Sequence, residues 1–397
     1  MDTCDRIAGV RRPRGRVGSM YSRTMPLRIA ISGGSLGGLF AGVLLHAAGH
    51  DVTIYERSTH GLEGRGAGLV GQREIFAILR EIGCEHVAQI GIVARERIFL
   101  DRGGRIIERH ETPQTQISWD RLFHAFRERI PAGRYIQGRE ILAASETGDA
   151  VRATFADGTS VEVDLVIGAD GVGSAVRQAV VGPDPAPAYA GYAAWRGLFP
   201  EGDLPADAAA LLLERFAFFD MQGSHILGYL VAGPDGSTEP GRRRYNWVWY
   251  RKAPAADGSL AAALTDEAGH RHDYSLPPGG MSAAAREILA RDAGALLPAA
   301  FAAAVQAETK PFVQAVFDYT APTMATRRIV LLGDAAFVVR PHTAMGVSKA
   351  AGDARSLRTH LAGSSDLASA LAAYDAERRS FGLDIAERGR RLGAPLE

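Results

Sequence analysis

Residues 27–57 read LRIAISGGSLGGLFAGVLLHAAGHDVTIYER, and this stretch decides the fold class. Leu27 to Ser32 is a short apolar run that is typical of a buried parallel strand. The glycine-rich segment Gly33 to Gly38 predicts a tight turn, and Leu39 to Ala48 predicts a helix that packs on a sheet. Val52 to Tyr55 predicts a second strand. The order strand, turn, helix, strand predicts an α/β fold of the Rossmann type.

A unit of this kind binds dinucleotides. Glycines allow backbone N–H groups to approach a pyrophosphate, whose charge is stabilised by the helix N-terminus. Glu56 follows the second strand and is placed to accept hydrogen bonds from an adenosine ribose. Ser35 stands where the pattern usually has its middle glycine, and it adds only a Cβ and a hydroxyl, so a phosphate can still be cradled. A tight turn without a ligand is the alternative.

Length and composition exclude several classes of protein. The chain has 397 residues, enough for two domains or one large one, and 45 basic residues balance 45 acidic ones. This balance predicts neither nucleic-acid binding nor binding to a membrane surface. Cys4 and Cys84 are the two cysteines and lack metal-ligand spacing, so we predict no metal site and a reduced, cytoplasmic setting. No apolar run is long enough to span a bilayer.

The remaining pattern predicts the domain boundaries. Residues 1–26 are rich in arginine without an apolar period, and we expect a disordered leader, with a targeting peptide as the alternative. We assign residues 27–185 to a nucleotide-binding domain and residues 186–318, which contain many aromatic and strand-like segments, to a smaller antiparallel-sheet substrate domain. Residues 319–397 return to the first domain and add a C-terminal helix. The predicted hairpin 97–108 can join either domain.

Two further motifs follow the first. They are IGADGVGSAVR at 167–177 and RIVLLGDAAFVVRPHTAMGVSKAAGDARSL at 328–357. Together with the first turn they resemble the single-component flavoprotein aromatic hydroxylases, the para-hydroxybenzoate hydroxylase type. The segments 189–197 and 340–346 are similar to the 2,6-dihydroxypyridine 3-hydroxylase branch of that family. The chain departs from the family at Phe337, where histidine is usual, and at Trp119, where an arginine is frequent.

The resemblance implies FAD as the bound cofactor and NAD(P)H as a transiently bound reductant, because only one complete dinucleotide fingerprint is present. It implies that Glu56 binds the adenosine ribose, that Asp334 holds the ribityl or pyrophosphate region, and that the loop from Pro341 lies along the isoalloxazine. The cofactor-binding residues that it predicts are Gly33, Gly34, Ser35, Leu36, Gly37, Gly38, Glu56, Arg57, Gln72, Asp170, Gly333, Asp334, Pro341 and Gly346. A helix cap is the alternative for Asp334, and a strand-end turn for Asp170.

The resemblance also implies a reaction. A hydride from NAD(P)H reduces FAD, and O2 then gives a C4a-hydroperoxide that transfers OH to a small electron-rich ring, for which a hydroxypyridine is the candidate. His342 is the predicted catalytic residue, with a loop histidine bonded to backbone as the alternative. The predicted substrate contacts are Tyr192, Arg196, His225, Tyr229, Trp247 and Trp249, although an aromatic stripe is more often core and Arg196 can instead form an ion pair.

The sequence leaves two other functions as alternatives. A flavin-dependent halogenase shares this fold but needs a lysine after the first fingerprint, and here no lysine precedes Lys252. A non-catalytic FAD-binding sensor or interaction protein is the other alternative. The expected partners are a small aromatic substrate and O2, and the assembly state is open, with a homodimer as the candidate.

Overall fold

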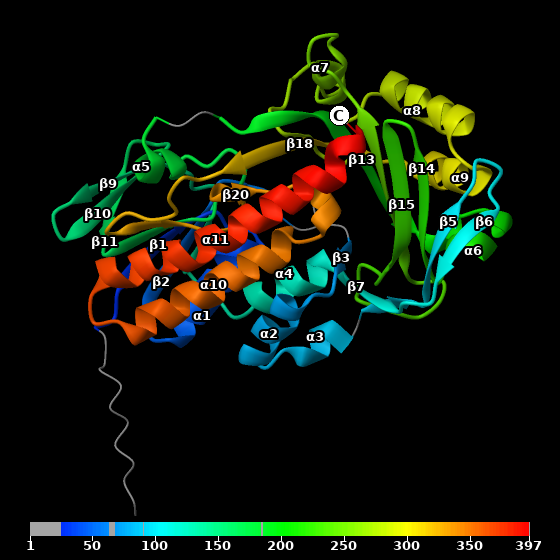
Figure 1. Ribbon diagram of the computed structural model, residues 1–397. Helices are drawn as coiled ribbons and strands as arrows, with labels where there is room; N and C mark the ends of the chain where they lie inside the picture. Colours follow the sequence, from blue (N-terminus) through cyan, green and yellow to red (C-terminus); the bar gives the residue numbers. More distant parts are fainter. Residues whose placement is uncertain (1–24, 63–67, 90, 184–185, 397) are drawn as a thin grey trace, which may run out of the picture.

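The computed structural model describes residues 25–62, 68–89, 91–183 and 186–396. An α/β part lies beside a large sheet, and the two C-terminal helices run across the α/β part toward that sheet (Figure 1). Except for its last two residues, the predicted leader lies outside the described residues.

A five-stranded parallel sheet forms the centre of the α/β part, in the order β19–β12–β1–β2–β8. Its strands are β1 (Arg28–Ser32), β2 (Asp51–Glu56), β8 (Tyr135–Gln137), β12 (Leu165–Gly168) and β19 (Ile329–Leu331). Every residue of β1 after Arg28 is buried, as expected for a strand covered on both faces. Because the strands are parallel, their carboxyl ends meet at one edge. The turns after β1, β12 and β19, which carry the three motifs, therefore converge there.

Helices cover one face of this sheet. The helix α1 (Leu36–Ala47) packs against α10 (Gly346–Gly363), and α10 packs against α11 (Leu367–Gly393), as Figure 1 shows. The shorter helices of this part are α2 (Arg73–Glu81), α3 (Glu85–Gln89), α4 (Trp119–Arg127) and α5 (Arg177–Val181). Apolar side chains of α1, α10 and the parallel strands belong to one continuous core.

Two three-stranded sheets complete the α/β part. β9 (Ile141–Thr147), β10 (Ala150–Phe155) and β11 (Ser160–Val163) form an antiparallel sheet that contacts β1 and β12. β3 (Gly68–Val70), β7 (Gln114–Ser118) and β4 (Ile92–Ala94) form the other, which contacts β15 of the large sheet. The second of these sheets therefore joins the two halves of the molecule.

The large sheet has the order β17–β18–β13–β16–β15–β14–β5–β6, with β20 paired to β18. Its strands are β5 (Glu96–Leu100), β6 (Ile106–His110), β13 (Ala188–Pro200), β14 (Arg215–Met221), β15 (Ser224–Val231), β16 (Arg244–Lys252), β17 (Ser275–Leu276), β18 (Phe312–Thr320) and β20 (Phe337–Val338). Neighbours are antiparallel except β14 and β5, which are parallel. The predicted hairpin at 97–108 is present as β5 and β6, and it extends this sheet.

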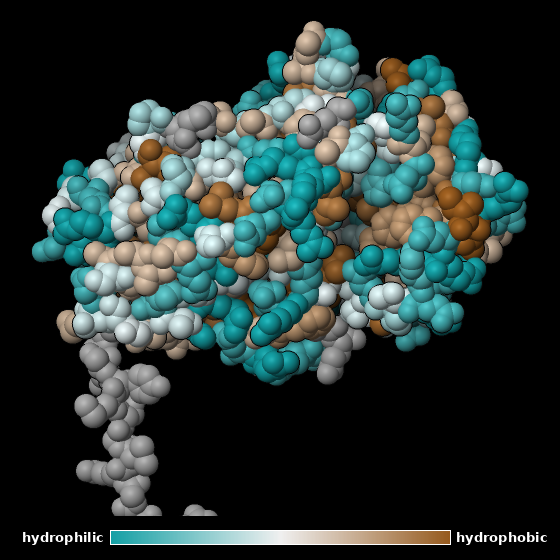
Figure 2. Space-filling model, in the orientation of Figure 1, coloured by the Kyte–Doolittle hydropathy of each residue, from teal (hydrophilic) through white to brown (hydrophobic). Residues whose placement is uncertain are grey.

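One face of the large sheet is covered by helices α6 (Ala206–Leu212), α7 (Ser259–Ala263), α8 (Ala283–Leu296) and α9 (Ala299–Ala307), which share a second core with it. Four short 3₁₀ segments are η1 (Glu201–Asp203), η2 (Gly333–Ala335), η3 (Pro341–Thr343) and η4 (Ala394–Leu396). Hydrophilic side chains cover most of the face seen in Figure 2, with apolar patches over the large sheet. Among the described residues, no helix combines the length and apolarity that crossing a membrane requires.

The predicted fold class is confirmed: a Rossmann-like parallel sheet is interleaved with an antiparallel-rich sheet formed by the middle of the chain. The domain boundaries at 186 and 319 stay predictions.

Candidate functional site

The turn after β1 is built from glycines because side chains do not fit there. Gly33 has a positive φ of 102°, and a Cβ on it would lie 2.4 Å from the carbonyl oxygen of Ala169. A Cβ on Gly38 would lie 1.9 Å from the carbonyl oxygen of Gly33, and one on Gly34 would lie 2.3 Å from the Tyr135 hydroxyl. Gly33 and Gly38 are therefore required by the tight turn beside the loop after β12, and Gly34 is required by its close approach to β8.

Ser35 occupies a position of this turn where a side chain has room. It is the N-cap residue of α1, it is exposed, and its hydroxyl makes no capping hydrogen bond within the described chain. The first helical hydrogen bond runs from the N–H of Leu39 to the carbonyl of Ser35. Earlier N–H groups of α1 consequently point out of the helix end, where an anionic group is stabilised.

Glu56, at the carboxyl end of β2, is buried and accepts two backbone hydrogen bonds. Its Oε2 accepts from the N–H of Gly34 and its Oε1 from the N–H of Ser58, both at 2.8 Å. The Tyr135 hydroxyl donates to the carbonyl of Gly34 at 3.0 Å. The glycine turn, the predicted ribose-binding carboxylate and β8 are thus locked together before any ligand binds.

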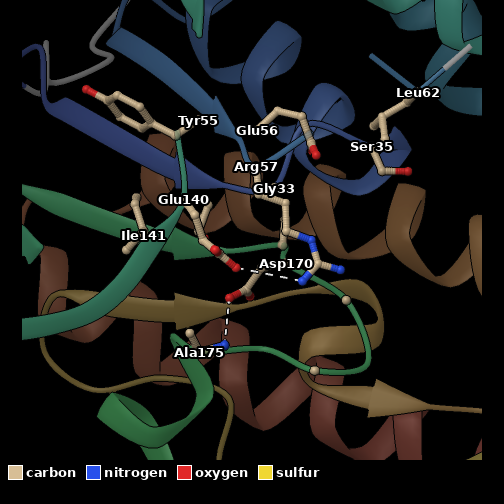
Figure 3. Close-up of a pocket in the computed structure, with 14 residues that line it drawn as sticks. Gly33, Ser35, Tyr55, Glu56, Arg57, Leu62, Glu140, Ile141, Asp170 and Ala175 are labelled. Carbon is tan, nitrogen blue, oxygen red and sulfur yellow. Dashed lines mark hydrogen bonds and ion pairs between the residues drawn. The ribbon is translucent and has the colours of Figure 1, made fainter. Parts of the chain in front are cut away.

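These segments line a pocket at the carboxyl edge of the parallel sheet. Figure 3 shows Ser35, Glu56 and Arg57 above Asp170, with Arg57 paired to Glu140 at 3.7 Å. Its walls come from the turn after β1, the end of β2, the start of β9 and the loop after β12. The pocket therefore joins the first two predicted motifs, which lie more than 130 residues apart in the sequence.

Asp170 uses its carboxylate to shape its own loop. Its Oδ1 accepts from the hydroxyl of Ser174 at 2.5 Å, and its Oδ2 accepts from the N–H groups of Ala175 at 2.9 Å and Val176 at 3.2 Å. Burial raises the pKa of Asp170, and these hydrogen bonds act in the opposite direction. The Asp170 side chain lines the pocket, but both of its carboxylate oxygens accept hydrogen bonds from residues of its own loop.

Arg177, which the sequence reasoning left out of the site, joins the second motif to the third. Its Nε donates to the carbonyl of Ala335 at 2.8 Å, and its Nη2 donates to the carbonyl of Asp334 at 3.0 Å. Its guanidinium lies over the ring of Tyr319, 4.0 Å from the centroid. The position of Arg177 at the end of IGADGVGSAVR could have indicated a role in the site. Its hydrogen-bond partners, however, depend on the fold.

Asp334 lies in η2, between the end of β19 and α10. Its side chain is 46% exposed, and its Oδ1 is 3.9 Å from Nζ of the buried Lys349. Burial within the surrounding protein raises the pKa of Asp334, Lys349 and Arg177 lower it, and Asp353 raises it. Neighbouring Gly333 donates its N–H to Asp353 at 2.9 Å. The side chain of Asp334 is therefore partly exposed beside a buried cation, and its role in holding a cofactor stays a prediction, as does the alternative of a helix cap.

The predicted flavin loop is held by contacts to α2. Pro341 opens η3, and Ala344 follows it with a positive φ of 53°, which is unusual for a residue with a Cβ. The side chain of Gln72 donates to the carbonyl of Ala344 at 2.9 Å. Gly346 begins α10 directly after this loop. Gln72 thus positions the loop in this structure, and direct contact with a cofactor stays a prediction.

A cluster of rings faces that loop from the large sheet. The Tyr192 hydroxyl is 2.9 Å from Nε2 of His342, and the His342 ring is 4.5 Å from that of Tyr250, centroid to centroid. His225 stacks on Tyr250 at 5.7 Å, and its Nδ1 forms a hydrogen bond with the carboxylate of the exposed Asp220. Burial, with the nearby charges of His225 and Arg340, lowers the pKa of His342 to about 4. The ring is therefore neutral at physiological pH, and the catalytic role of His342 stays a prediction.

Strand register divides the predicted substrate residues between two faces. Tyr192, Arg196, His225 and Tyr229 share the face that carries Tyr250, because Arg196 pairs with Val248 and His225 with Tyr250 across adjacent strands. Trp247 and Trp249 alternate with these positions and are fully buried in the core under α8 and α9. The structure therefore brings four of the six together and places the two tryptophans on the opposite side of the sheet.

Arg196 and Tyr229 already have partners. Arg196 donates to the side-chain oxygen of Gln314 at 2.7 Å, and the Tyr229 hydroxyl donates to the carbonyl of Gly68 at 2.9 Å. The charge of Arg196 lowers the pKa of Tyr229 and Tyr250, although burial is the larger effect and raises both. Arg196 thus lies in an aromatic environment, and within the described part of the chain its hydrogen-bond partner is an amide oxygen rather than a carboxylate.

FAD fits the residues present. The exposed end of α1 can take a pyrophosphate, Glu56 borders the pocket beside it, and the half-exposed Asp334 stands at the next turn along the same sheet edge. The ring cluster around His342 lies beyond that turn, at the large sheet.

Comparison with known proteins gives the family. A family model for an FAD binding domain matches residues 27–184 and 295–388, and one for an FAD binding domain-like unit matches residues 189–318. The 2,6-dihydroxypyridine 3-monooxygenase of Paenarthrobacter nicotinovorans is 31% identical over 93% of this chain and 91% of its own length. The 6-hydroxynicotinate 3-monooxygenase of Bordetella bronchiseptica is 25% identical over 83% of this chain and 81% of its own length.

The solved structure of 2,6-dihydroxypyridine-3-hydroxylase from Arthrobacter nicotinovorans is also similar, with a TM-score of 0.87 and 29% identity over 94% of this chain and 93% of that one. Neither the halogenase nor the non-catalytic alternative is favoured by these relatives. Because the first family model covers more than half of the chain and the dihydroxypyridine monooxygenase matches nine-tenths of it, this chain belongs to the single-component FAD-dependent aromatic hydroxylases.

Proposed function

We propose that the chain hydroxylates a ring carbon of a small hydroxypyridine, with NAD(P)H as reductant and O2 as oxidant. One oxygen atom enters the ring, and the other leaves as water with the hydride of the nicotinamide and one proton. Two relatives named above act on pyridines that carry hydroxyl groups, which supports this choice of ring. The single observation that carries the proposal is the ring cluster of Tyr192, His342 and Tyr250 beside the loop that precedes α10.

When bound, FAD supplies electron transfer from the nicotinamide and oxygen transfer to the ring. We assign the adenosine end to the Gly33–Gly38 turn and Glu56, and the ribityl segment to Asp334. The loop from Pro341 to Gly346 then borders the isoalloxazine. Backbone N–H groups at the start of α10 stabilise negative charge near that end of the cofactor.

His342 acts as a neutral base or hydrogen-bond acceptor at the substrate hydroxyl. With the Tyr192 hydroxyl donating to Nε2, the ring proton resides on Nδ1, and a proton from the substrate can pass through Tyr192 to His342. Loss of that proton makes the substrate ring more electron-rich, which favours attack on an electrophilic oxygen. Arg196, on the same face of the sheet, stabilises the resulting ring oxyanion.

Apolar side chains around this cluster exclude water. Tyr192 and Tyr250 are buried together with Val248 and Leu396, the last of which belongs to the C-terminal η4. Water exclusion keeps the oxygen-transfer step from ending as hydrogen peroxide. The C-terminal segment therefore contributes to the site, which its position in the sequence did not predict.

A substrate screen tests this proposal. The holoenzyme is incubated with NADH or NADPH and a matched panel of hydroxypyridines, phenols and hydroxybenzoates, and nicotinamide consumption and product mass are recorded. We expect a hydroxypyridine to stimulate consumption and to gain one oxygen atom. A halogenated product in the presence of chloride or bromide would instead favour a halogenase. Unstimulated consumption with every ring would favour a non-catalytic flavoprotein.

We propose either NADH or NADPH as the reductant, and the same screen decides between them. The proposed homodimer is tested by light scattering during gel filtration.

A further inference from the structure

Lys349 is a buried cation without a hydrogen bond. It is one of three lysines in the sequence and lies in the first turn of α10, with 1% of its side chain exposed. Within the part of the chain that the structure describes, its Nζ makes no hydrogen bond. Burying an ammonium without hydrogen bonds is costly, so its presence requires an explanation.

The position of Lys349 relates it to the cofactor-binding turns. The next residue, Ala350, lies where two of those turns approach α10: a Cβ on Gly37 would be 3.7 Å from it, and one on Gly333 would be 3.5 Å away. Gly37 belongs to the first turn of α1, and Gly333 precedes Asp334. Lys349 therefore stands at the junction of the first and third motifs.

Other charged groups around this junction are already engaged. Asp353 accepts from Nε of Arg378 and from the N–H of Gly333. Glu74 of α2 accepts from the hydroxyl of Ser348 at 3.1 Å. Arg177 of α5 donates to backbone carbonyls of η2. Among the described residues, the carboxylate that pairs with the ammonium is that of Asp334, at 3.9 Å, and 46% of the Asp334 side chain is exposed.

We propose that Lys349 is a positioning residue for the cofactor, whose ammonium keeps the Asp334 carboxylate ionised and turned toward the ribityl and pyrophosphate segment of FAD. The inference rests on the proposed role of Asp334 in holding that segment. The cation is needed because burial and the neighbouring Asp353 both raise the pKa of Asp334, whereas Lys349 and Arg177 lower it. Arg177 donates hydrogen bonds to backbone carbonyls in this region, whereas Lys349 is the cation that pairs with the side chain of Asp334.

The sign of the pH dependence follows from this arrangement. Without the ammonium, the pKa of Asp334 rises further, so the carboxylate becomes protonated at a higher pH than in the wild type. A protonated group no longer accepts with both oxygens. FAD affinity in a variant without the cation should therefore fall as the pH is lowered, starting from a higher pH than in the wild type.

The test measures the dissociation constant of FAD for apoprotein, by flavin fluorescence quenching, between about pH 5.5 and 8.5. Lys349→Met replaces the ammonium by an apolar group of similar length, Lys349→Arg keeps the charge, and Lys310→Met at an exposed lysine is the matched control. We expect Lys349→Met to bind FAD about tenfold more weakly at neutral pH and progressively more weakly below it. Lys349→Arg and the control should stay within about threefold of wild type.

A double-mutant cycle tests the role proposed for Lys349 separately from the role proposed for Asp334. In an Asp334→Asn background, Lys349→Met should change FAD affinity by less than about threefold, because there is no carboxylate left to hold. Equal losses in both backgrounds, or a pH profile of Lys349→Met that matches the wild type, overturn the inference about Lys349. Unaltered affinity in Asp334→Asn alone overturns the role proposed for Asp334. If Lys349→Met does not fold, Lys349→Gln carries the same expectation, and the melting temperature of each apoprotein shows which variants are folded.

Discussion

The hydroxyl of Tyr192 lies 2.9 Å from Nε2 of His342, although 150 positions separate the two residues in the sequence. The contact connects β13 of the large sheet to the loop between β20 and α10. It fixes the imidazole against the face that carries Tyr250 and His225, where burial lowers the pKa of His342 to about 4. At pH 7 the ring is therefore neutral and carries no permanent charge, so it can contact a neighbouring group through hydrogen bonds.

The first prediction concerns coupling of oxygen transfer. His342→Ala should retain FAD but convert a larger share of the consumed NAD(P)H into hydrogen peroxide, because the substrate hydroxyl loses its acceptor. Tyr192→Phe should show the same effect more weakly. The measurement is product formed per NAD(P)H oxidised, with flavin content recorded. His46→Ala, at an exposed position in the last turn of α1, is the control. Unaltered coupling and unaltered substrate affinity in His342→Ala would place His342 outside the site.

The second prediction concerns acid stability. The pKa of His342 is about 4 in the folded chain, against an ordinary value of 6.5. Between these two pH values the imidazole is protonated in the unfolded chain but largely neutral in the folded chain. Stability from this group is complete above pH 6.5 and is lost as the pH falls toward 4. The wild type should lose on the order of 1–2 kcal/mol more than His342→Gln between pH 7 and pH 4.5. Urea unfolding of both proteins at the two pH values checks this, and parallel losses would contradict it.

The third prediction concerns the ribose-binding carboxylate. Glu56→Ala should weaken FAD binding by about 10- to 100-fold, because it removes the carboxylate beside the pocket and leaves the Gly34 N–H without its acceptor. Glu140→Gln, in the wall of the same pocket, is the matched control and should change affinity much less. Equilibrium dialysis of apoprotein with FAD gives both values. Equal affinities for Glu56→Ala and the control would mean that the adenosine end binds elsewhere.

The fourth prediction compares neighbouring positions in the glycine turn. Gly34→Ala should destabilise the protein by about 1–3 kcal/mol and lower flavin content, since its Cβ would lie 2.3 Å from the Tyr135 hydroxyl. Ser35→Gly should be tolerated, because the Ser35 side chain is exposed and makes no capping bond. Thermal unfolding and the flavin-to-protein absorbance ratio test the pair. Similar behaviour of the two variants would refute the steric account of the turn.

The fifth prediction separates the two faces of the large sheet. Trp249→Phe should cost about 1–3 kcal/mol of stability, because it leaves a void under α8 and α9 and removes the donor to Ser224, while substrate affinity stays close to wild type. Tyr250→Phe should instead alter substrate affinity or coupling with little change in stability. Unfolding midpoints and substrate KM for both variants decide this. A Trp249 variant with normal stability and impaired substrate binding would reverse the assignment.

The sequence determined the fold class and the cofactor end of the site. An apolar strand, a turn that only glycine can form and a carboxylate at the next strand end are local patterns, and each one is dictated by backbone sterics or by hydrogen bonding within about 30 residues. The parallel strands then brought the other two motifs to the same edge, because the carboxyl ends of parallel strands must meet. For this reason the sequence alone predicts a shared cofactor site for Gly33, Glu56 and Asp170, and the three residues line one pocket.

Only the tertiary structure decided the substrate end. Period-2 alternation put Trp247 and Trp249 on one face of a strand, but which face is covered by helices depends on α8 and α9, which follow later in the chain. The low pKa of His342 arises from burial against Tyr192 and Tyr250, neither of which is near it in sequence. The same holds for Lys349, whose isolation depends on α1 and η2 closing around α10. The burial of a side chain and the groups that it contacts depend on residues that are distant in the sequence, so a local pattern of residues does not predict them.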